Sequence, residues 1–177
     1  QDETINILGV SEVASRGIRK GQIVDIEDAT ASINSALDIA ERMAGYSIDR
    51  VFVSISGTHI ESQNSKGIVA ISQPEREISE FDVQRVLEAA GAVSMPSTRS
   101  IIHVLPKAFT VDGEAGIKVP TGMTGIRLET DTHIITGATT AMRNLAKCVR
   151  MIGVDVEELV FSGMAAAQAV LTETEKE

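Results

Sequence analysis

The spacing of apolar residues changes twice along the chain, and this change constrains the fold more than any other feature. Residues 25–45 carry apolar side chains three and four positions apart, with Asp25 placed as an N-cap and Gly45 as a stop. This spacing predicts an amphipathic helix. Residues 49–57 then alternate in polarity and predict a strand. A helix that leads into a strand is typical of an α/β unit.

The C-terminal part shows the same helical and strand patterns. Residues 138–153 have a helical apolar face that ends at Gly153, residues 156–163 predict a short strand, and residues 164–171 predict a helix built largely of alanine. At the other end, residues 5–13 form a strand-like run.

The middle of the chain has a different pattern. We predict two short strands joined by a polar turn over residues 58–72, and a helix over residues 78–93 with Ser79 as N-cap. Residues 99–111 predict an extended run interrupted at Pro106, and residues 125–136 a long strand with one packed face. This order favours a module inserted into a larger α/β domain over two domains in tandem.

The loop between those last two strands is rich in glycine and proline, with Gly113, Gly116, Pro120, Gly122 and Gly125. Glycine permits positive φ and proline limits chain entropy, so a loop of this length can hold a defined shape without secondary structure. It contains no nucleophile paired with a base. We interpret it as a scaffold for a contact surface and not as a catalytic lid.

Composition excludes several classes of protein. The formal net charge of −9 argues against nucleic acid as a partner, because binding to phosphates relies on Lys and Arg. Cys148 is the single cysteine, which excludes an internal disulfide and fits a reducing compartment. The sequence contains no run of apolar residues long enough for a membrane-spanning helix, and its first residues do not resemble a signal peptide.

Motifs for chemistry are missing from the sequence. It contains no phosphate loop, dinucleotide fingerprint or zinc-protease motif. His59, His103 and His133 lie in or beside expected strands without the spacing of a metal site. Glu129 and Asp131 share one strand face, but no activated base accompanies them. We therefore expect no catalytic, cofactor-binding or metal-binding residue in the chain.

Four stretches, in chain order, carry a resemblance to a known family: SRGIRKGQIVDIEDA, VFVSISGTHIESQNSKGIVAI, HVLPKAFTVDGEAGIKVPTGMTGIRLE and VFSGMAAAQAVLTETEKE. They resemble consecutive blocks of the FtsA family, the actin-like proteins of bacterial cell division. The third block is long and specific. PilM, an actin-family relative from pilus assembly, shares the inserted module but fits these blocks less well.

The resemblance implies an α/β fold in which a partial actin-like, ribonuclease H-like lobe carries an inserted α+β SHS2 subdomain. Residues 1–55 would be the first part of the actin-like subdomain 1A, residues 56–135 the SHS2 subdomain 1C, and residues 136–177 the return to 1A, ending at the first connecting helix. The family binds ATP with Mg²⁺ through two phosphate loops, and neither occurs in this sequence. Gln1 is also not an initiating methionine. We therefore expect a segment of a longer ATP-binding parent with weak or uncertain ATPase activity, and expect the segment itself to be no enzyme and to hold no cofactor.

The resemblance also implies a function. FtsA tethers FtsZ filaments of the Z ring to the cytoplasmic face of the membrane and recruits later divisome proteins such as FtsN. In the family, 1C supplies protein contacts and self-association into polymers. FtsZ binding and peripheral membrane attachment, through a C-terminal amphipathic helix, involve other parts of the parent protein.

Within the inserted module, edge strands are the natural contact sites, because unpaired backbone groups can meet a partner. Our candidate interaction residues are Ile68, Arg127, Glu129 and Asp131. Ile68 is equally suited to core packing. Two alternatives stay open: a lobe of an actin-like ATPase whose nucleotide turnover is the main activity, and a PilM-like pilus assembly adaptor.

Overall fold

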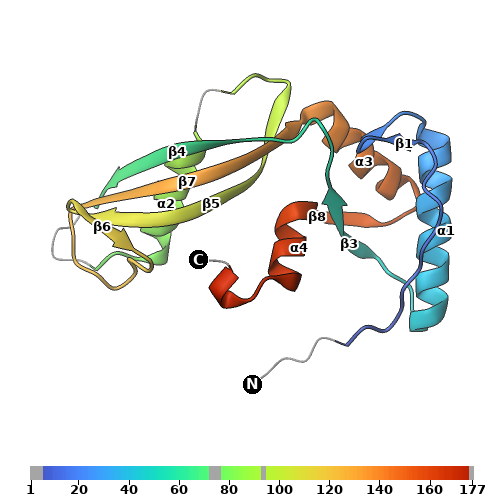
Figure 1. Ribbon diagram of the computed structural model, residues 1–177, viewed down its shortest axis with the longest axis horizontal. Coiled ribbons are helices and arrows are strands. Elements are labelled where there is room, and N and C mark those ends of the chain that lie inside the picture. Colours follow the sequence, from blue (N-terminus) through green and yellow to red (C-terminus); the bar gives the residue numbers. More distant parts are fainter. Residues whose placement is uncertain (1–5, 72–76, 93–94, 176–177) are drawn as a thin grey trace. The chain divides into compact units, whose positions relative to one another are not determined.

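The computed structural model describes residues 6–71, 77–92 and 95–175, and these form two compact units (Figure 1). The first unit comprises Gln1–His59 and Thr139–Glu177, and the second comprises Ile60–Ala138, against the 56–135 expected for the inserted module. The elements in chain order are β1 (Ile18–Arg19), β2 (Gln22–Ile23), α1 (Ile26–Ala44), β3 (Arg50–Ile55), β4 (Glu61–Ala70), α2 (Glu80–Gly91), β5 (Arg99–Val111), β6 (Glu114–Ile117), β7 (Arg127–Ala138), α3 (Thr139–Met151), β8 (Asp155–Phe161), α4 (Ser162–Val170) and a short 3₁₀ turn (Glu173–Glu175).

The first unit contains a parallel pair of strands, β3 and β8, with α1 and α3 packed against each other beside it. The predicted limits of α1 are confirmed. The Asp25 carboxylate accepts a hydrogen bond from the Asp28 N–H at 3.0 Å, and Gly45 adopts φ +84° while its N–H donates to the Glu41 carbonyl at 2.8 Å. These contacts satisfy backbone groups that every helix leaves open at its ends.

The β1–β2 hairpin packs closely against the end of β3. Gly21 adopts φ +77°, and a Cβ atom at this position would overlap the Ser56 carbonyl oxygen. The His59 ring nitrogen Nε2 lies 3.3 Å from the Gly21 carbonyl oxygen. Only glycine allows this approach, so the hairpin is fixed to the segment that leaves the first unit.

The strand predicted over residues 5–13 is wrong for the part that the structure describes. Residues 6–16 have no regular secondary structure, and residue 5 lies outside the described residues. The alternation of apolar residues suits a strand, but a strand also requires a neighbour for its backbone groups. Here the Val10 N–H contacts Met43 Sδ at 3.3 Å, and the Ser11 hydroxyl donates to the Ala36 carbonyl at 2.6 Å.

The second unit is a four-stranded antiparallel sheet in the order β4-β7-β5-β6, with α2 against one face (Figure 1). The central strand β7 alternates as predicted between buried side chains and more exposed ones. The core of this unit is a cluster of buried side chains from both layers: Ile71, Ile78, Val86, Phe109, Val111 and Leu128. Burial of this apolar face is the main driving force for the packing of helix on sheet.

The sequence signal for α2 is confirmed in detail. Ser79 and Asp82 form a capping box, in which the Ser79 hydroxyl accepts from the Asp82 N–H at 3.4 Å and the Asp82 carboxylate accepts from the Ser79 N–H at 3.1 Å. The helix then crosses β4 at Gly67, where a Cβ atom would overlap the Val86 carbonyl oxygen. The absence of a side chain at Gly67 therefore sets the distance between helix and sheet.

Three predictions for the second unit are wrong. Residues 61–70 form one strand, because each of its ten residues pairs in register with β7. Pro106 does not interrupt β5, although the register with β7 shifts between Pro106 and Ala108. On the other side of β5, β6 pairs only with residues 109–111, so among the described residues no strand there requires an N–H group from residue 106. The glycine-rich loop also contains secondary structure, namely β6.

Candidate functional site

Histidine, cysteine and carboxylate side chains are the groups of this chain that could hold a metal ion or act in catalysis. Among the residues it describes, no three His, Cys, Asp or Glu side chains gather closely enough to hold a metal ion. His59 is 7% exposed and Cys148 is fully buried. None of the helices in the described part of the chain is both long and apolar enough to cross a membrane.

The four predicted contact residues come together on one face of the second unit. Ile68 of β4 is directly opposite Glu129 of β7, with Arg127 and Asp131 two positions to either side of Glu129 on the same strand. This is the face of the sheet opposite α2, because the alternating residues of β7, such as Leu128, are buried beneath the helix. The Ile68 side chain is 52% exposed, so it does not belong to the core.

The charges on this open sheet face are largely paired with one another. Arg127 Nε lies 2.9 Å from Glu129 Oε1, and Lys66 Nζ lies 3.1 Å from Asp131 Oδ1. Such exposed pairs add little to stability, about 0–1 kcal/mol each. They do fix the positions of the side chains and neutralise the face, which leaves Ile68 as an apolar side chain within a polar row.

The sequence interpretation missed three polar residues beside this row. The Asn64 side-chain oxygen accepts hydrogen bonds from Lys107 Nζ and His133 Nδ1, both at 2.9 Å. No local signal could have placed Asn64 and Lys66 in this row, because their positions opposite His133 and Asp131 follow from the register of β4 with β7.

The outer edge of β4 adds a second property to this face. β4 lies at one end of the sheet order and pairs over ten residues with β7 alone. Its other side therefore presents a row of backbone N–H and C=O groups without a strand partner in the described part of the chain. Such an edge can accept an extended segment of another protein.

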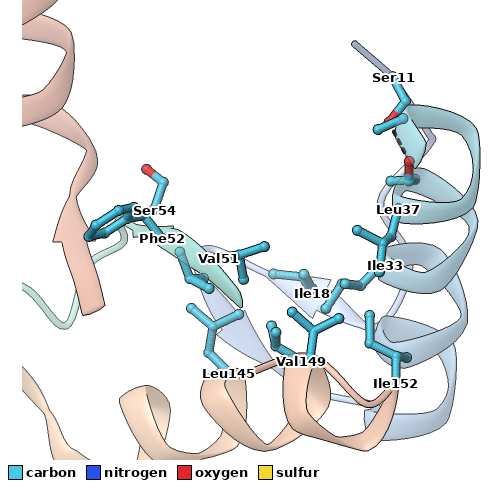
Figure 2. Close-up of a pocket in the computed structure, with 14 residues that line it drawn as sticks. Ser11, Ile18, Ile33, Leu37, Val51, Phe52, Ser54, Leu145, Val149 and Ile152 are labelled. Atoms are coloured by element: carbon cyan, nitrogen blue, oxygen red, sulfur yellow. Dashed lines mark hydrogen bonds between the residues drawn. The ribbon is translucent and has the colours of Figure 1, made fainter. Parts of the chain in front are cut away.

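The first unit has a separate feature, an apolar groove of about 390 Å³ (Figure 2). Side chains of α1, β3 and α3 form its walls, among them Leu37, Val51 and Val149, and Ser11 lies at its rim. Phe52 also lines the groove and is 68% exposed. β3 pairs with β8 on one side only within the described residues. The groove therefore leaves apolar side chains such as Phe52 exposed within the described part of the chain.

Comparison with solved structures defines the class of protein. The fold is similar to that of a chain in the PilM-PilN type IV pilus biogenesis complex, with a TM-score of 0.52 over 86% of this chain and 39% of the other. Sequence identity is 14%, so this likeness concerns the fold alone. A model of the SHS2 domain inserted in FtsA matches residues 57–136. The chain is thus part of an actin-like α/β lobe that carries an SHS2 insertion, and the expected fold class is confirmed.

Curated relatives are similar in sequence to nearly the whole chain. The chain is 43% identical to cell division protein FtsA of Pseudomonas aeruginosa, 44% identical to that of Borreliella burgdorferi and 42% identical to that of Bacillus subtilis. Each match covers 99% of this chain but only 40–43% of the relative, so the chain spans about two fifths of their length. Over nearly its whole length the chain is therefore similar to cell division protein FtsA.

Proposed function

We propose that this chain is part of a cell-division scaffold that tethers FtsZ filaments to the inner face of the cytoplasmic membrane and recruits later division proteins. The observation that carries the proposal is the 42–44% identity to proteins named cell division protein FtsA over 99% of the chain. The chain covers about two fifths of those relatives. We therefore assign attachment to FtsZ and peripheral attachment to the membrane at the division site to other parts of the parent.

The local function that we propose is protein contact through the second unit, both with later division proteins such as FtsN and with further copies of the scaffold. The open sheet face supports this role, since it combines the exposed Ile68 with the accessible edge of β4. An extended partner segment would pair with the β4 backbone and cover Ile68, while Arg127, Glu129 and Asp131 would meet its polar side chains. No nucleic acid is expected as a partner, because the net charge is −9.

Binding of the cytoplasmic segment of FtsN, measured by biolayer interferometry, tests this role. Ile68→Lys should weaken binding about tenfold or more, because it removes the apolar contact and places a second ammonium two residues from Lys66. Tyr46→Ala is a matched control, since Tyr46 is also exposed, at 55%, but belongs to the first unit. Equal binding by Ile68→Lys would exclude the β4 surface. No binding by the unaltered chain would contradict recruitment of FtsN by this segment.

A second candidate function is a lobe of an actin-like ATPase, and the apolar groove of the first unit favours it. We propose that further parts of the parent cover this groove, complete the lobe and bind ATP with Mg²⁺. The present residues alone should bind no ATP, since their sequence has no phosphate loop. Calorimetry on the chain and on the full-length parent tests this: micromolar affinity of the chain alone would refute it. The alternative of a pilus assembly adaptor is supported by the fold only. Binding of the parent protein to FtsZ and to a pilus peptide, measured side by side, distinguishes the division scaffold from the pilus adaptor.

A further inference from the structure

Lys107 of β5 adds a charge to the open sheet face that the ion pairs of this face do not neutralise. The charges of the two ion pairs described above cancel each other. Lys107 is exposed and takes part in no ion pair of the residues that the structure describes. Its Nζ donates to the side-chain oxygen of Asn64, a neutral group, at 2.9 Å. The face therefore keeps an excess positive charge, although the chain as a whole carries −9.

The side chains that β4 contributes to this face are accessible along the whole strand. Every second residue is exposed and points the same way, namely Ser62, Asn64, Lys66, Ile68 and Ala70. The Lys66 side chain is 73% exposed even though it forms an ion pair. β4 is also the outermost strand on its side of the sheet (Figure 1). A strand added to its free edge would therefore lie beside these side chains.

The geometry of a sheet determines which partner residues would meet them. Residues opposite each other on neighbouring strands share a face, with Cβ atoms about 4.5–5.5 Å apart, and every second residue points the same way. A partner residue opposite Ile68 would thus be two positions from the one opposite Lys66 and four from the one opposite Asn64. A carboxylate opposite Asn64 would also be within reach of Lys107, whose Nζ already lies at the Asn64 side chain.

We propose that the open sheet face binds an extended acidic segment of another protein, in which two carboxylates meet Lys66 and Lys107 and an apolar side chain covers Ile68. The inference rests on the contact role proposed above and names the chemistry of the partner. Along the partner segment, the acidic residues occupy positions two and four residues from the apolar one. Opposite charges favour this partner, and like charges disfavour a basic one.

Lys66 makes the free edge of β4 selective. A lysine on an edge strand opposes uncontrolled strand pairing, because the added strand would cover a charge without a partner of its own. A carboxylate opposite Lys66 removes this penalty, whereas a neutral or basic side chain does not. The same lysine thus excludes most extended segments and admits an acidic one.

Fluorescence anisotropy with labelled synthetic peptides and the full-length protein tests the proposal. The probes are short threonine-rich peptides whose alternate central residues are Glu, Glu and Val, in this order or in reverse, since a partner can run parallel or antiparallel to β4. Matched peptides carry Gln or Lys in place of both Glu residues. One of the Glu peptides should bind about tenfold or more tightly than its Gln counterpart, and the Lys counterpart should bind most weakly.

Charge reversal at Lys107 shows whether this side chain recognises the carboxylate. Lys107→Glu should bind the Glu peptide about tenfold or more weakly, and it should bind the Lys peptide more tightly than the unaltered protein does. Lys147→Glu is the matched control, since Lys147 is an exposed lysine of α3 in the first unit. Ile68→Ala should weaken binding of the Glu and Gln peptides alike. Circular dichroism melts verify that each variant is folded.

The outcomes separate this inference from the contact role on which it rests. Equal binding of the Glu and Gln peptides, or an equal loss in Lys107→Glu and Lys147→Glu, would overturn acidic recognition and leave the contact role standing. The same holds if no peptide binds but the cytoplasmic segment of FtsN does. If Lys107→Glu changes the sedimentation of the protein alone, a second copy occupies the face and the inference is wrong. If neither the peptides nor the FtsN segment binds, the contact role and the inference are both overturned.

Discussion

Replacement of Gly67 by alanine tests the packing that holds the second unit together. The new Cβ atom would overlap the Val86 carbonyl oxygen and would lie 2.8 Å from the Ala90 nitrogen and 3.0 Å from Ala90 Cβ. Gly67 has no positive φ, so alanine brings no backbone strain and the cost is steric. Two of the contacts are with helix backbone, which cannot move aside like the end of a long side chain.

The size of the effect follows from these distances. Ordinary contact with a Cβ atom begins at 3.4 Å, and the contact with the Val86 carbonyl oxygen falls short of this by more than an ångström, so α2 would have to move away from β4 by about that much. A gap of about 0.5–1 Å already removes roughly a quarter to a half of the dispersion attraction across a contact. The residues affected include Val86 and Ala90, both fully buried. Overpacked cores commonly lose about 1–3 kcal/mol, and we expect about 2–3 kcal/mol here.

Hydrogen exchange measured by mass spectrometry is the assay of choice, because it reports on α2 and β4 separately from the first unit. Gly67→Ala should raise the exchange rates of both elements and leave those of α1 unchanged. Gly91→Ala is the matched control: its Cβ would meet only side chains at 3.7 Å, and alanine in place of a helical glycine stabilises by up to about 1 kcal/mol. Unchanged protection of α2 in Gly67→Ala would refute the close-packing argument.

Three smaller perturbations test other local features. Ser79→Ala removes the hydroxyl of the capping box and should destabilise α2 by about 1 kcal/mol, seen as faster exchange in its first turn; unaltered exchange would show that the hydroxyl is dispensable. Asp112→Ala should lower the free energy of unfolding in urea by about 1–3 kcal/mol, because the carboxylate accepts hydrogen bonds from the Ile126 and Arg127 N–H groups at 3.1 and 2.8 Å and the residue has φ +49°. Asp112→Asn should retain much of this stability, and an equal loss in both variants would contradict the hydrogen-bonding role. Hydrogen bonds from the Thr172 N–H and hydroxyl hold the pKa of the Glu175 carboxyl below its ordinary value. The stability that these hydrogen bonds give to the C-terminal turn is therefore fully present above the ordinary carboxylate pKa, and it is lost as the pH falls through the lowered pKa. An NMR titration of the Thr172 amide should show this loss, and a midpoint at or above the ordinary value would contradict it.

The helices could be predicted because their signals are local. The apolar period of α1, its cap at Asp25 and its stop at Gly45 all lie within one segment, and the same holds for Ser79 and Asp82 at the start of α2. Each cap satisfies backbone groups within one turn of the helix, so the sequence alone determines where the helix begins and ends. The alternation of β7 predicted its two faces for the same reason.

Part of the contact surface was also accessible from the sequence. Arg127, Glu129 and Asp131 share a face because residues two apart along a strand point the same way. Their neighbours across the sheet were not accessible: Lys66 reaches Asp131 only because β4 pairs with β7 in one particular register.

The remaining errors have one physical cause. A strand needs a hydrogen-bonded neighbour that can lie anywhere in the chain, and the pattern of the strand itself does not say whether the neighbour is there. β4 is continuous because β7 pairs with all ten of its residues. β5 passes through Pro106 because, in the described part of the chain, no strand lies beside this residue on the side away from β7. Residues 6–16 are irregular despite an apolar alternation. The sequence by itself determined the helices, the faces of β7 and the similarity to FtsA. Only the tertiary structure decided which strands pair and which side chains meet across them, because those contacts join residues far apart in the chain.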